Sequence, residues 1–362
     1  MNFSEWRLLD TGIQKAPYNM ALEKVLLASC AEGTVPNTLH LLEFFPCVLL
    51  GYNQSVGGEV DTDYCRANGI EINRRISGGG CIYMDSGVLG WEIIAKKNTT
   101  SIPGSLDEMY RALCGGVVLA LSGFGIGASY RPVNDIEVNG RKISGTGGTE
   151  LDDSFIFHGT VLVDFHTETM IKALKLPLKK LEDKQVSGFM QRTVSMRELL
   201  GYVPPMPDVK AALAKAFSKT LGAVFAGGGL SAGETEMMKT ELPFFGSQEW
   251  IDGKQSGGSS MNTFEHKAPG GLIRVSLVLD NDKNYIRSAF ITGDFFSSPG
   301  SIMELEHILK NTRADSRVIT KKVNEFFSSR SIIIPGVSAG DFSHAIFMAA
   351  RSTGQGSGSG KD

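Results

Sequence analysis

Two adjacent arginines that lead into three consecutive glycines are the feature of this sequence that most restricts its fold. The stretch is Arg74-Arg75-Ile76-Ser77-Gly78-Gly79-Gly80, and strand-like residues flank it on both sides. Glycine lets the backbone turn with positive φ and approach a ligand closely, because no Cβ stands in the way. Exposed N–H groups in such a loop form an anion-binding concavity, and arginines add forked donors for carboxylate or phosphate oxygens. The stretch therefore predicts an anion-binding turn between strands. The alternative is an ordinary tight turn with a solvated arginine pair.

Length and composition indicate a globular protein with more than one domain. The chain has 362 residues, of which 42% are hydrophobic and 21% are charged, so it can bury a sizeable core. Its net charge of −3 lacks the basic footprint of a nucleic-acid-binding protein. No apolar run reaches membrane-spanning length, and the first residues do not have the pattern of a secretory signal. We therefore expect no nucleic-acid partner, no membrane association and no export.

The cysteines and histidines do not form a recognisable framework. The five cysteines are odd in number and scattered, and the six histidines are dispersed. This usage is typical of reduced thiols in a cytoplasm rather than of disulfides. No Cys/His spacing matches a zinc site. We therefore expect a cytoplasmic protein without a metal cluster of that kind.

A second informative stretch runs from Asn134 to Gly145. Asn139-Gly140 lies between two alternating segments, which is the strongest short-range signal for a β-hairpin. Such a hairpin would hold Asn134, Asp135 and Lys142 close together on rigid strands. A later strand, residues 155–165, is apolar apart from a polar interruption at His158.

The chemistry of Lys142 has two candidate forms. It could stabilise charge that develops on a phosphoryl group, or it could be a nucleophile if burial lowered its pKa. Because the nearby Asp135 favours the ammonium form, we prefer the electrostatic role. Asp135 could also help to hold a magnesium ion that bridges nucleotide phosphates. The alternatives are a solvated lysine at a sheet edge and, for His158, a hydrogen-bonded core histidine.

Three further patterns organise the chain. Asn19 has the residue type of an N-cap for a helix that continues to about Cys30. The glycines at 123–127 follow a helix instead of opening one, so we interpret them as a helix stop and not as a dinucleotide-binding turn. The Gly/Ser-rich residues 252–262 predict a linker after a first domain, 1–251. A small domain at 263–350 and a disordered tail at 351–362 would follow.

At these residues the sequence resembles the lipoate–protein ligase family. Residues 74–80, with Tyr83 and Asp85, resemble the family's RRxSGGG loop. The segments 134–136 and 142–145 resemble its NDI and KxSG motifs, and His158-Gly159-Thr160 resembles its HGT strand. Residues 19–23 and 51–54 resemble the N-terminal helix and the G-R-x-Q turn. The resemblance spans about residues 6–250 and extends more weakly into a C-terminal accessory domain.

The resemblance implies an α/β fold of the α+β type. A mixed β-sheet flanked by helices, related to biotin ligases and class II aminoacyl-tRNA synthetases, would be followed by a small α+β domain. It also implies a two-step reaction in which lipoate is the substrate and Mg-ATP the cofactor. The lipoate carboxylate attacks the α-phosphate of ATP to give lipoyl-AMP and pyrophosphate, and a lysine of an acceptor lipoyl domain then attacks the activated carbonyl. The acceptor would be a 2-oxoacid dehydrogenase subunit, a glycine-cleavage H-like protein or another lipoate-binding protein, and the enzyme would act as a monomer.

The residue roles also follow from the resemblance. Lys142 would be catalytic and would bridge the lipoyl carbonyl oxygen and the α-phosphate. Asn134 and Asp135 would bind Mg²⁺ or phosphate, with Asp135 as the metal ligand, and would orient Lys142. The residues expected to bind the acyl-adenylate or to line the lipoyl tunnel are Arg74, Arg75, Ser77, Gly78, Gly79, Gly80, Tyr83, His158, Gly159 and Thr160.

Three departures from the family pattern keep other functions open. Tyr52 stands where many ligases have arginine and is more familiar from octanoyltransferases, which use no ATP. Cys81 follows the glycines directly, and Met84 replaces the usual histidine before Asp85. An acyltransferase with a cysteine thioester is therefore the second hypothesis. A lipoyl-domain binder without catalysis is the third, and the intact Lys142 and Asp135 argue against it. We further hypothesise that the accessory domain moves during the reaction.

Overall fold

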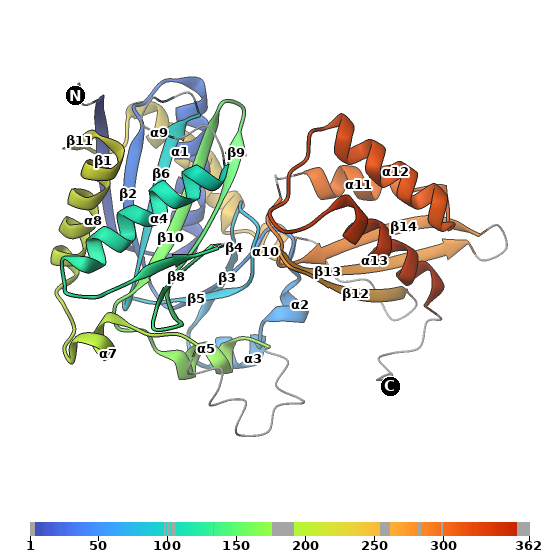
Figure 1. The fold of residues 1–362 in the computed structure, drawn as a ribbon, viewed down its shortest axis with the longest axis horizontal. Helices are drawn as coiled ribbons and strands as arrows, with labels where there is room; N and C mark the ends of the chain where they lie inside the picture. The colour runs from blue at the N-terminus through green and yellow to red at the C-terminus, as the bar shows by residue number, and fades with distance from the viewer. Residues whose placement is uncertain are drawn as a thin grey trace. The chain divides into compact units, whose positions relative to one another are not determined.

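The chain forms two compact units in the computed structural model, which describes residues 4–97, 99, 102, 106–132, 134–175, 192–253, 261–280, 284–297 and 300–352 (Figure 1). The first unit comprises Met1–Leu49, Val60–Ile76 and Ile82–Ile251, and the second comprises Leu50–Glu59, Ser77–Cys81 and Asp252–Asp362. Most of the predicted linker (254–260) and of the predicted tail (353–362) lies outside the described residues.

A mixed sheet of eight strands is the centre of the first unit. Its order is β11-β1-β2-β6-β10-β9-β8-β7, with β11 and β2 parallel to β1. From β2 to β7, neighbouring strands are antiparallel. The strands are β1 (Ser4–Gln14), β2 (Thr38–Phe44), β6 (Val88–Lys96), β7 (Ser129–Arg131), β8 (Asp135–Val138), β9 (Arg141–Leu151), β10 (Ser154–Leu162) and β11 (Ala223–Gly227).

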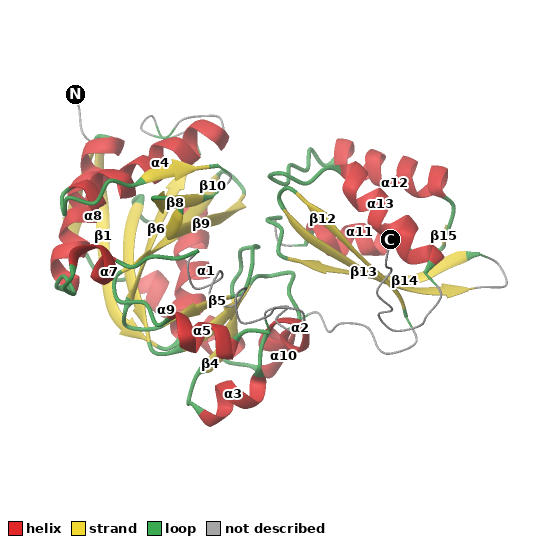
Figure 2. Cartoon of the chain, turned by 60° about the horizontal axis from the view of Figure 1, so that its bottom comes forward, coloured by secondary structure: helices red, strands yellow, loops and turns green. Residues whose placement is uncertain are grey.

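Helices cover both faces of this sheet, as Figure 2 shows. On one face, α1 (Ala16–Glu32) and α9 (Ala232–Phe245) pack on a core that includes Leu42 and Ile156. On the other face, α4 (Leu106–Ser122) and α8 (Met206–Leu221) pack on a core that includes Trp91. Since successive strand residues point to opposite faces, the β6 and β10 residues divide between these two cores. Two layers of helices around one sheet therefore bury both of its faces.

The remaining elements of the first unit are short. A small sheet has the strand order β4-β3-β5. Its strands and the nearby helices are β3 (Cys47–Leu50), β4 (Glu71–Arg74), β5 (Ile82–Met84), α3 (Thr62–Ala67), α5 (Thr167–Ala173), α7 (Met196–Leu200) and α10 (Gln248–Asp252).

The start of α1 corrects one expectation. The helix begins at Ala16 with Lys15 as its N-cap residue and a proline in its first turn, which is a favoured place for proline. Asn19 therefore lies inside the helix and is fully buried, and its Nδ2 donates to the Glu43 carbonyl oxygen at 3.0 Å. The N-cap prediction was wrong because the amide bonds across to β2 instead of capping its own helix.

Two other local predictions are confirmed. The hairpin of β8 and β9 turns at Asn139 and Gly140, with φ of 52° and 78°. Helix α4 ends at Ser122, and Gly125 has a φ of 77°, so the glycines at 123–127 stop a helix. These turns are readable from the sequence because each depends on its own residues.

The second unit contains a sheet with the order β12-β13-β14-β15 and its own core. Phe295 and Phe342 are among the fully buried side chains of that core. The elements are α2 (Val56–Glu59), β12 (Asn262–Ala268), β13 (Gly271–Asp280), β14 (Tyr285–Gly293), β15 (Thr312–Arg313), α11 (Ser301–Leu309), α12 (Ser316–Ser329) and α13 (Ala339–Arg351).

The predicted fold class is confirmed. The first unit is a mixed sheet flanked by helices, and the second contains a smaller sheet with helices packed on it. Among the described residues, no helix combines the length and the apolar character that crossing a membrane requires.

Candidate functional site

The β8–β9 hairpin brings Lys142 and Asp135 together, as the sequence predicts. Lys142 Nζ lies 2.6 Å from Asp135 Oδ1. Arg131 Nη2 donates to Asp135 Oδ2 at 2.7 Å, so two cations flank this carboxylate. Lys142 is 38% exposed and Asp135 15% exposed. Solvent or a ligand can therefore reach the Lys142 side chain of this pair.

Gly145 leaves room for the Lys142 side chain. A Cβ added at Gly145 would lie 2.6 Å from Lys142 Nζ, so the ammonium passes directly over this glycine. The Gly145 N–H points to Thr160 Oγ1 on β10 at 3.4 Å. Two predicted residues, Lys142 and Thr160, therefore both lie next to Gly145.

Asn134 connects the start of β8 to β9 through hydrogen bonds with Thr146. Its Nδ2 donates to the Thr146 carbonyl oxygen at 3.0 Å, and the Thr146 N–H donates back to the Asn134 carbonyl oxygen at 2.9 Å. These bonds fix the entry into β8 and hence the position of Asp135. The role of Asn134 toward Mg²⁺ or phosphate stays a prediction.

The two arginines before the glycines are buried and differ in their contacts. Arg74, 1% exposed, donates to the carbonyl oxygens of Trp250 and Ile251 at 3.2 and 2.9 Å. Arg75, 6% exposed, donates to the Leu49 carbonyl oxygen at 2.8 Å. Arg74 therefore joins β4 to α10, and the adenylate contacts predicted for both arginines stay predictions.

The glycine loop belongs to the second unit. Gly79, with a φ of 92°, donates its N–H to the Phe295 carbonyl oxygen at 3.2 Å. A Cβ added at Gly78 would lie 2.5 Å from the same oxygen. Tyr52 N donates to the Ser77 carbonyl oxygen at 2.8 Å. The loop is a turn between β4 and β5, as predicted, and its anion binding stays a prediction. It packs so tightly on the segment after β14 that only glycine fits at position 78.

A neighbouring loop is fastened to the same segment. Asn53 Nδ2 donates to Ser297 Oγ at 2.9 Å, and Asn53 accepts a backbone bond from Gly293 at 3.1 Å. Glu59 also forms an ion pair with Arg274. The two segments 50–59 and 77–81 thus share their packing partners within the second unit.

Tyr83 lies in β5 of the first unit and is 6% exposed. Burial, followed by the charge of Asp85, raises its pKa. Asp85 also accepts from the Gly87 N–H at 2.9 Å and lies 3.0 Å from His166 Nδ1. The tyrosine ring contacts Phe165, with ring centroids 6.3 Å apart. Tyr83 is therefore a buried, protonated phenol beside a carboxylate.

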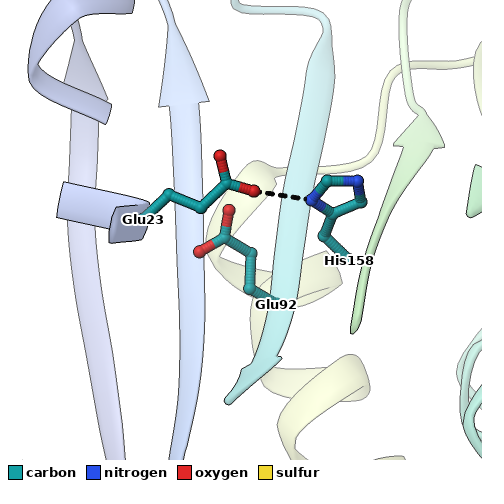
Figure 3. Close-up of side chains that lie close together, drawn as sticks. All are labelled: Glu23, Glu92 and His158. Carbon is teal, nitrogen blue, oxygen red and sulfur yellow. Dashed lines mark hydrogen bonds and ion pairs between the residues drawn. The ribbon is translucent and has the colours of Figure 1, made fainter. Parts of the chain in front are cut away.

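His158 forms a buried cluster with two glutamates, drawn in Figure 3. His158 Nδ1 lies 2.8 Å from Glu23 Oε1, and Glu92 places its carboxylate next to that of Glu23. One ligand atom from each of the three residues lies within 4.8 Å of the others. Glu23 comes from α1, Glu92 from β6 and His158 from β10.

The strand register explains how the cluster forms. His40 of β2 is the cross-strand partner of Glu92, and Glu92 is the partner of His158. His40 Nδ1 lies 2.8 Å from Glu92 Oε2, and its Nε2 lies 2.9 Å from Thr11 Oγ1. We call His40, Glu92 and His158, together with Glu23 above them, the polar row. It runs across three strands on the face that α1 covers.

Burial governs protonation in the polar row. Burial lowers the pKa of His40 to about 3, so this imidazole is neutral at pH 7. Burial and then the charge of Glu23 raise the pKa of Glu92 well above its usual range. Burying a carboxylate without a cationic partner disfavours its charged form.

Two glycines of β9 lie between the hairpin lysine and the polar row on the same face of the sheet. Gly147 is the partner of His158 across β9 and β10, and Gly145 is two residues away on the same face. Two residues of a strand span about 7 Å. Gly159 points to the opposite face, where an added Cβ would lie 2.4 Å from the Trp91 ring.

Glu23, Glu92 and His40 form a group that the sequence alone does not reveal. The available signal was a polar residue between apolar neighbours in each of two mainly apolar strands, His40 in 38–45 and Glu92 in 88–96. Such a residue in a buried strand needs a partner. Which partner it has depends on strand order, which no local pattern in the sequence supplies.

Comparison with known families finds two matches. The catalytic domain of lipoyl protein ligases A and B matches residues 15–218. The C-terminal region of bacterial lipoate protein ligases matches residues 260–346.

The similar proteins include both octanoyltransferases and lipoate-protein ligases. An octanoyltransferase LipM from Kyrpidia tusciae is 30% identical over 268 residues, covering 68% of this chain and 97% of the relative. The lipoate-protein ligase LplJ from Bacillus subtilis is 27% identical over 315 residues, covering 83% of this chain and 88% of the relative. The solved structure of P. falciparum LipL1 with lipoate covers 90% of this chain with a TM-score of 0.71 at 19% identity, which supports the fold alone.

Proposed function

Because this chain belongs to the lipoyl protein ligase A/B family, we propose that it is an ATP-dependent lipoate–protein ligase. In the proposed reaction, lipoate is converted to lipoyl-AMP, and the lipoyl group then passes to a lysine of an acceptor lipoyl domain. The proposed acceptor is a 2-oxoacid dehydrogenase subunit, a glycine-cleavage H-like protein or another lipoate-binding protein. We further propose that the enzyme acts as a monomer in the cytoplasm.

The observation that carries the proposal is the C-terminal region. Residues 260–346 match the bacterial lipoate protein ligase C-terminus. The Bacillus ligase aligns with 83% of this chain, whereas nearly the whole Kyrpidia octanoyltransferase, 97% of it, aligns with only 68%. A ligase therefore accounts for more of this chain than an octanoyltransferase does.

We propose that the acyl group binds to the first unit. In the proposal, the carboxylate of lipoate lies near Lys142 and its chain runs over Gly145 and Gly147, which carry no side chains, toward His158. Lys142 donates from its ammonium to oxygens that gain negative charge during adenylation. Preorganised donors of this kind lower the barrier most in a water-poor site. Asp135 holds the ammonium in place.

Lys142 and Asp135 suit the phosphates of ATP better than they suit Mg²⁺. The ammonium of Lys142 suits a phosphate oxygen. Asp135 is a carboxylate that Mg²⁺ accepts, yet both of its oxygens already face cations, Lys142 and Arg131. A magnesium ion would have to compete with them, so we assign to Asp135 the orientation of Lys142 and derive no step through the metal.

The test is lipoate-dependent exchange of pyrophosphate into ATP. We expect exchange in the wild-type protein and a loss of at least about 10²-fold in Lys142→Ala. Lys215→Ala, which removes an exposed lysine of α8, is the matched control and should retain exchange. Gly145→Ala should also lower exchange strongly, because its methyl group would displace the ammonium. Thermal melts of each variant would exclude unfolding as the cause.

Octanoyl transfer is the second candidate, favoured by the 30% identical relative and by Cys81, which is partly exposed. In that reaction, the Cys81 thiolate attacks the carbonyl of an octanoyl-carrier thioester and releases the carrier thiol. The acceptor lysine then attacks the enzyme thioester and regenerates the thiol. Absence of exchange, together with an octanoyl adduct that disappears in Cys81→Ser, would replace the ligase proposal with this one.

A further inference from the structure

The polar row contains two buried carboxylates for which the described part of the chain supplies no lysine or arginine. Glu23 is fully buried and Glu92 is 3% exposed. Their ion-pair partners are the imidazoles of His158 and His40. Burying a charge is costly unless it is paired or binds a metal. The row therefore requires positive charge from protons or from a bound cation.

The donor atoms converge as metal ligands do. One oxygen of Glu23, one oxygen of Glu92 and one ring nitrogen of His158 lie within 4.8 Å of one another, which small side-chain movements would bring into one coordination sphere. Glu23 Oε2 is buried and has no hydrogen-bond partner. A buried oxygen without a partner is a rare and unfavourable arrangement that a bound cation relieves.

Residues behind the donors hold them in place. His40 Nδ1 lies 2.8 Å from Glu92 Oε2, and Thr11 Oγ1 lies 2.9 Å from the other ring nitrogen of His40. Metal sites typically have such outer partners, which fix the orientation of each ligand. Because α1 supplies Glu23 and the sheet supplies the other donors, a cation here would join the helix to β6 and β10.

We propose that Glu23, Glu92 and His158 form a binding site for one divalent transition-metal ion, with Zn²⁺ as the best match. Two carboxylates balance the charge of a divalent ion, and the imidazole favours zinc over magnesium or calcium. Three protein ligands leave a fourth position open. The site is separate from the Lys142–Asp135 pair and does not depend on the proposed ligase activity.

The test is metal binding by the full chain without nucleotide or lipoate. Protein stripped with a chelator is titrated with Zn²⁺ alone, and bound metal is counted by mass spectrometry. Co²⁺, titrated in parallel, reports the coordination geometry through its visible absorption. We expect one ion per chain and a higher melting temperature. Failure to bind either metal at micromolar concentration would overturn the proposal and leave a shared proton as the source of charge.

Variants separate this site from adventitious binding. Glu92→Gln and His158→Gln should each abolish binding, and His40→Phe should weaken it by about 10–100-fold through loss of an outer partner. Glu241→Gln, which alters a glutamate of α9 paired with Lys24, is the matched control. Unchanged stoichiometry in both ligand variants would overturn the proposal. If one ligand variant does not fold, Glu23→Gln replaces it.

Discussion

Glu234 and the Glu23–Glu92 pair are equally buried but differ in what surrounds them. Glu234 is fully buried, and both of its oxygens accept from Arg7, at 2.7 Å each. The Ser231 N–H adds a third donor at 2.7 Å. Glu23 has one imidazole contact and one oxygen without a partner. Both carboxylate oxygens of the buried Glu234 thus accept hydrogen bonds, whereas one carboxylate oxygen of the equally buried Glu23 accepts none. We call the Arg7–Glu234 pair saturated and the Glu23–Glu92 pair unsaturated.

Whether all oxygens of a buried carboxylate have hydrogen-bond donors distinguishes a structural acid from one that can bind a ligand. The Arg7–Glu234 pair joins β1 to α9 and leaves neither oxygen of the carboxylate for a ligand. In the polar row, Glu23 Oε2 has no hydrogen-bond partner among the described residues, so it can still accept a bond. Buried groups of the second kind indicate sites, since leaving them unsatisfied costs stability unless something binds.

The largest expected effect follows from breaking the saturated pair. Arg7→Met leaves Glu234 buried without a cation, and we expect the free energy of unfolding to fall by about 3–5 kcal/mol. Urea unfolding at pH 7 measures it. The double variant Arg7→Met/Glu234→Gln should recover part of the loss, because it removes the uncompensated charge. A loss below about 1 kcal/mol in the single variant would mean that the pair is dispensable and the comparison fails.

A smaller effect concerns pH. Although burial opposes it, hydrogen bonds from Arg7 lower the pKa of Glu234 below its usual value. A lowered carboxyl pKa stabilises the folded state above the unfolded pKa, about 4.5, and this contribution disappears as the pH falls through the folded value. The stability difference between wild type and Arg7→Met should therefore shrink from pH 7 toward pH 3. A difference that is constant with pH would contradict an electrostatic origin.

The smallest effect is expected in the unsaturated pair. Glu92→Gln removes one of two neighbouring acids that no arginine or lysine pairs with among the described residues. In chelator-treated protein we expect the free energy of unfolding to stay within about 1 kcal/mol of wild type. Urea unfolding with Glu241→Gln as control measures it. A loss as large as that of Arg7→Met would show that Glu92 is a structural acid like Glu234.

Local motifs of the site were predictable from the sequence. The hairpin at Asn139-Gly140 follows from two residues that accept positive φ, and it brings Lys142 to Asp135 across a short connection. The glycine loop was recognised as a turn for the same reason. What the loop packs against was not predictable, because Phe295 lies more than two hundred residues further along the chain.

The errors and omissions have a common physical origin. Asn19 was assigned as a helix cap from its residue type, but its amide bonds to the Glu43 carbonyl oxygen on β2. Glu23, Glu92 and His40 could not be recognised as a group, because the strand pairing that joins Glu92 to His40 and His158 spans distant parts of the chain. In each case, a distant segment supplies the partner that decides what the side chain does.

The sequence by itself determined the turns, the hairpin and its charged pair, because φ preferences and alternation act over a few residues. Only the tertiary structure brought His40, Glu92 and His158 into one row across three strands and placed Glu23 of α1 next to them. Strand order and register set which buried polar groups meet, and they depend on how both faces of the sheet are covered.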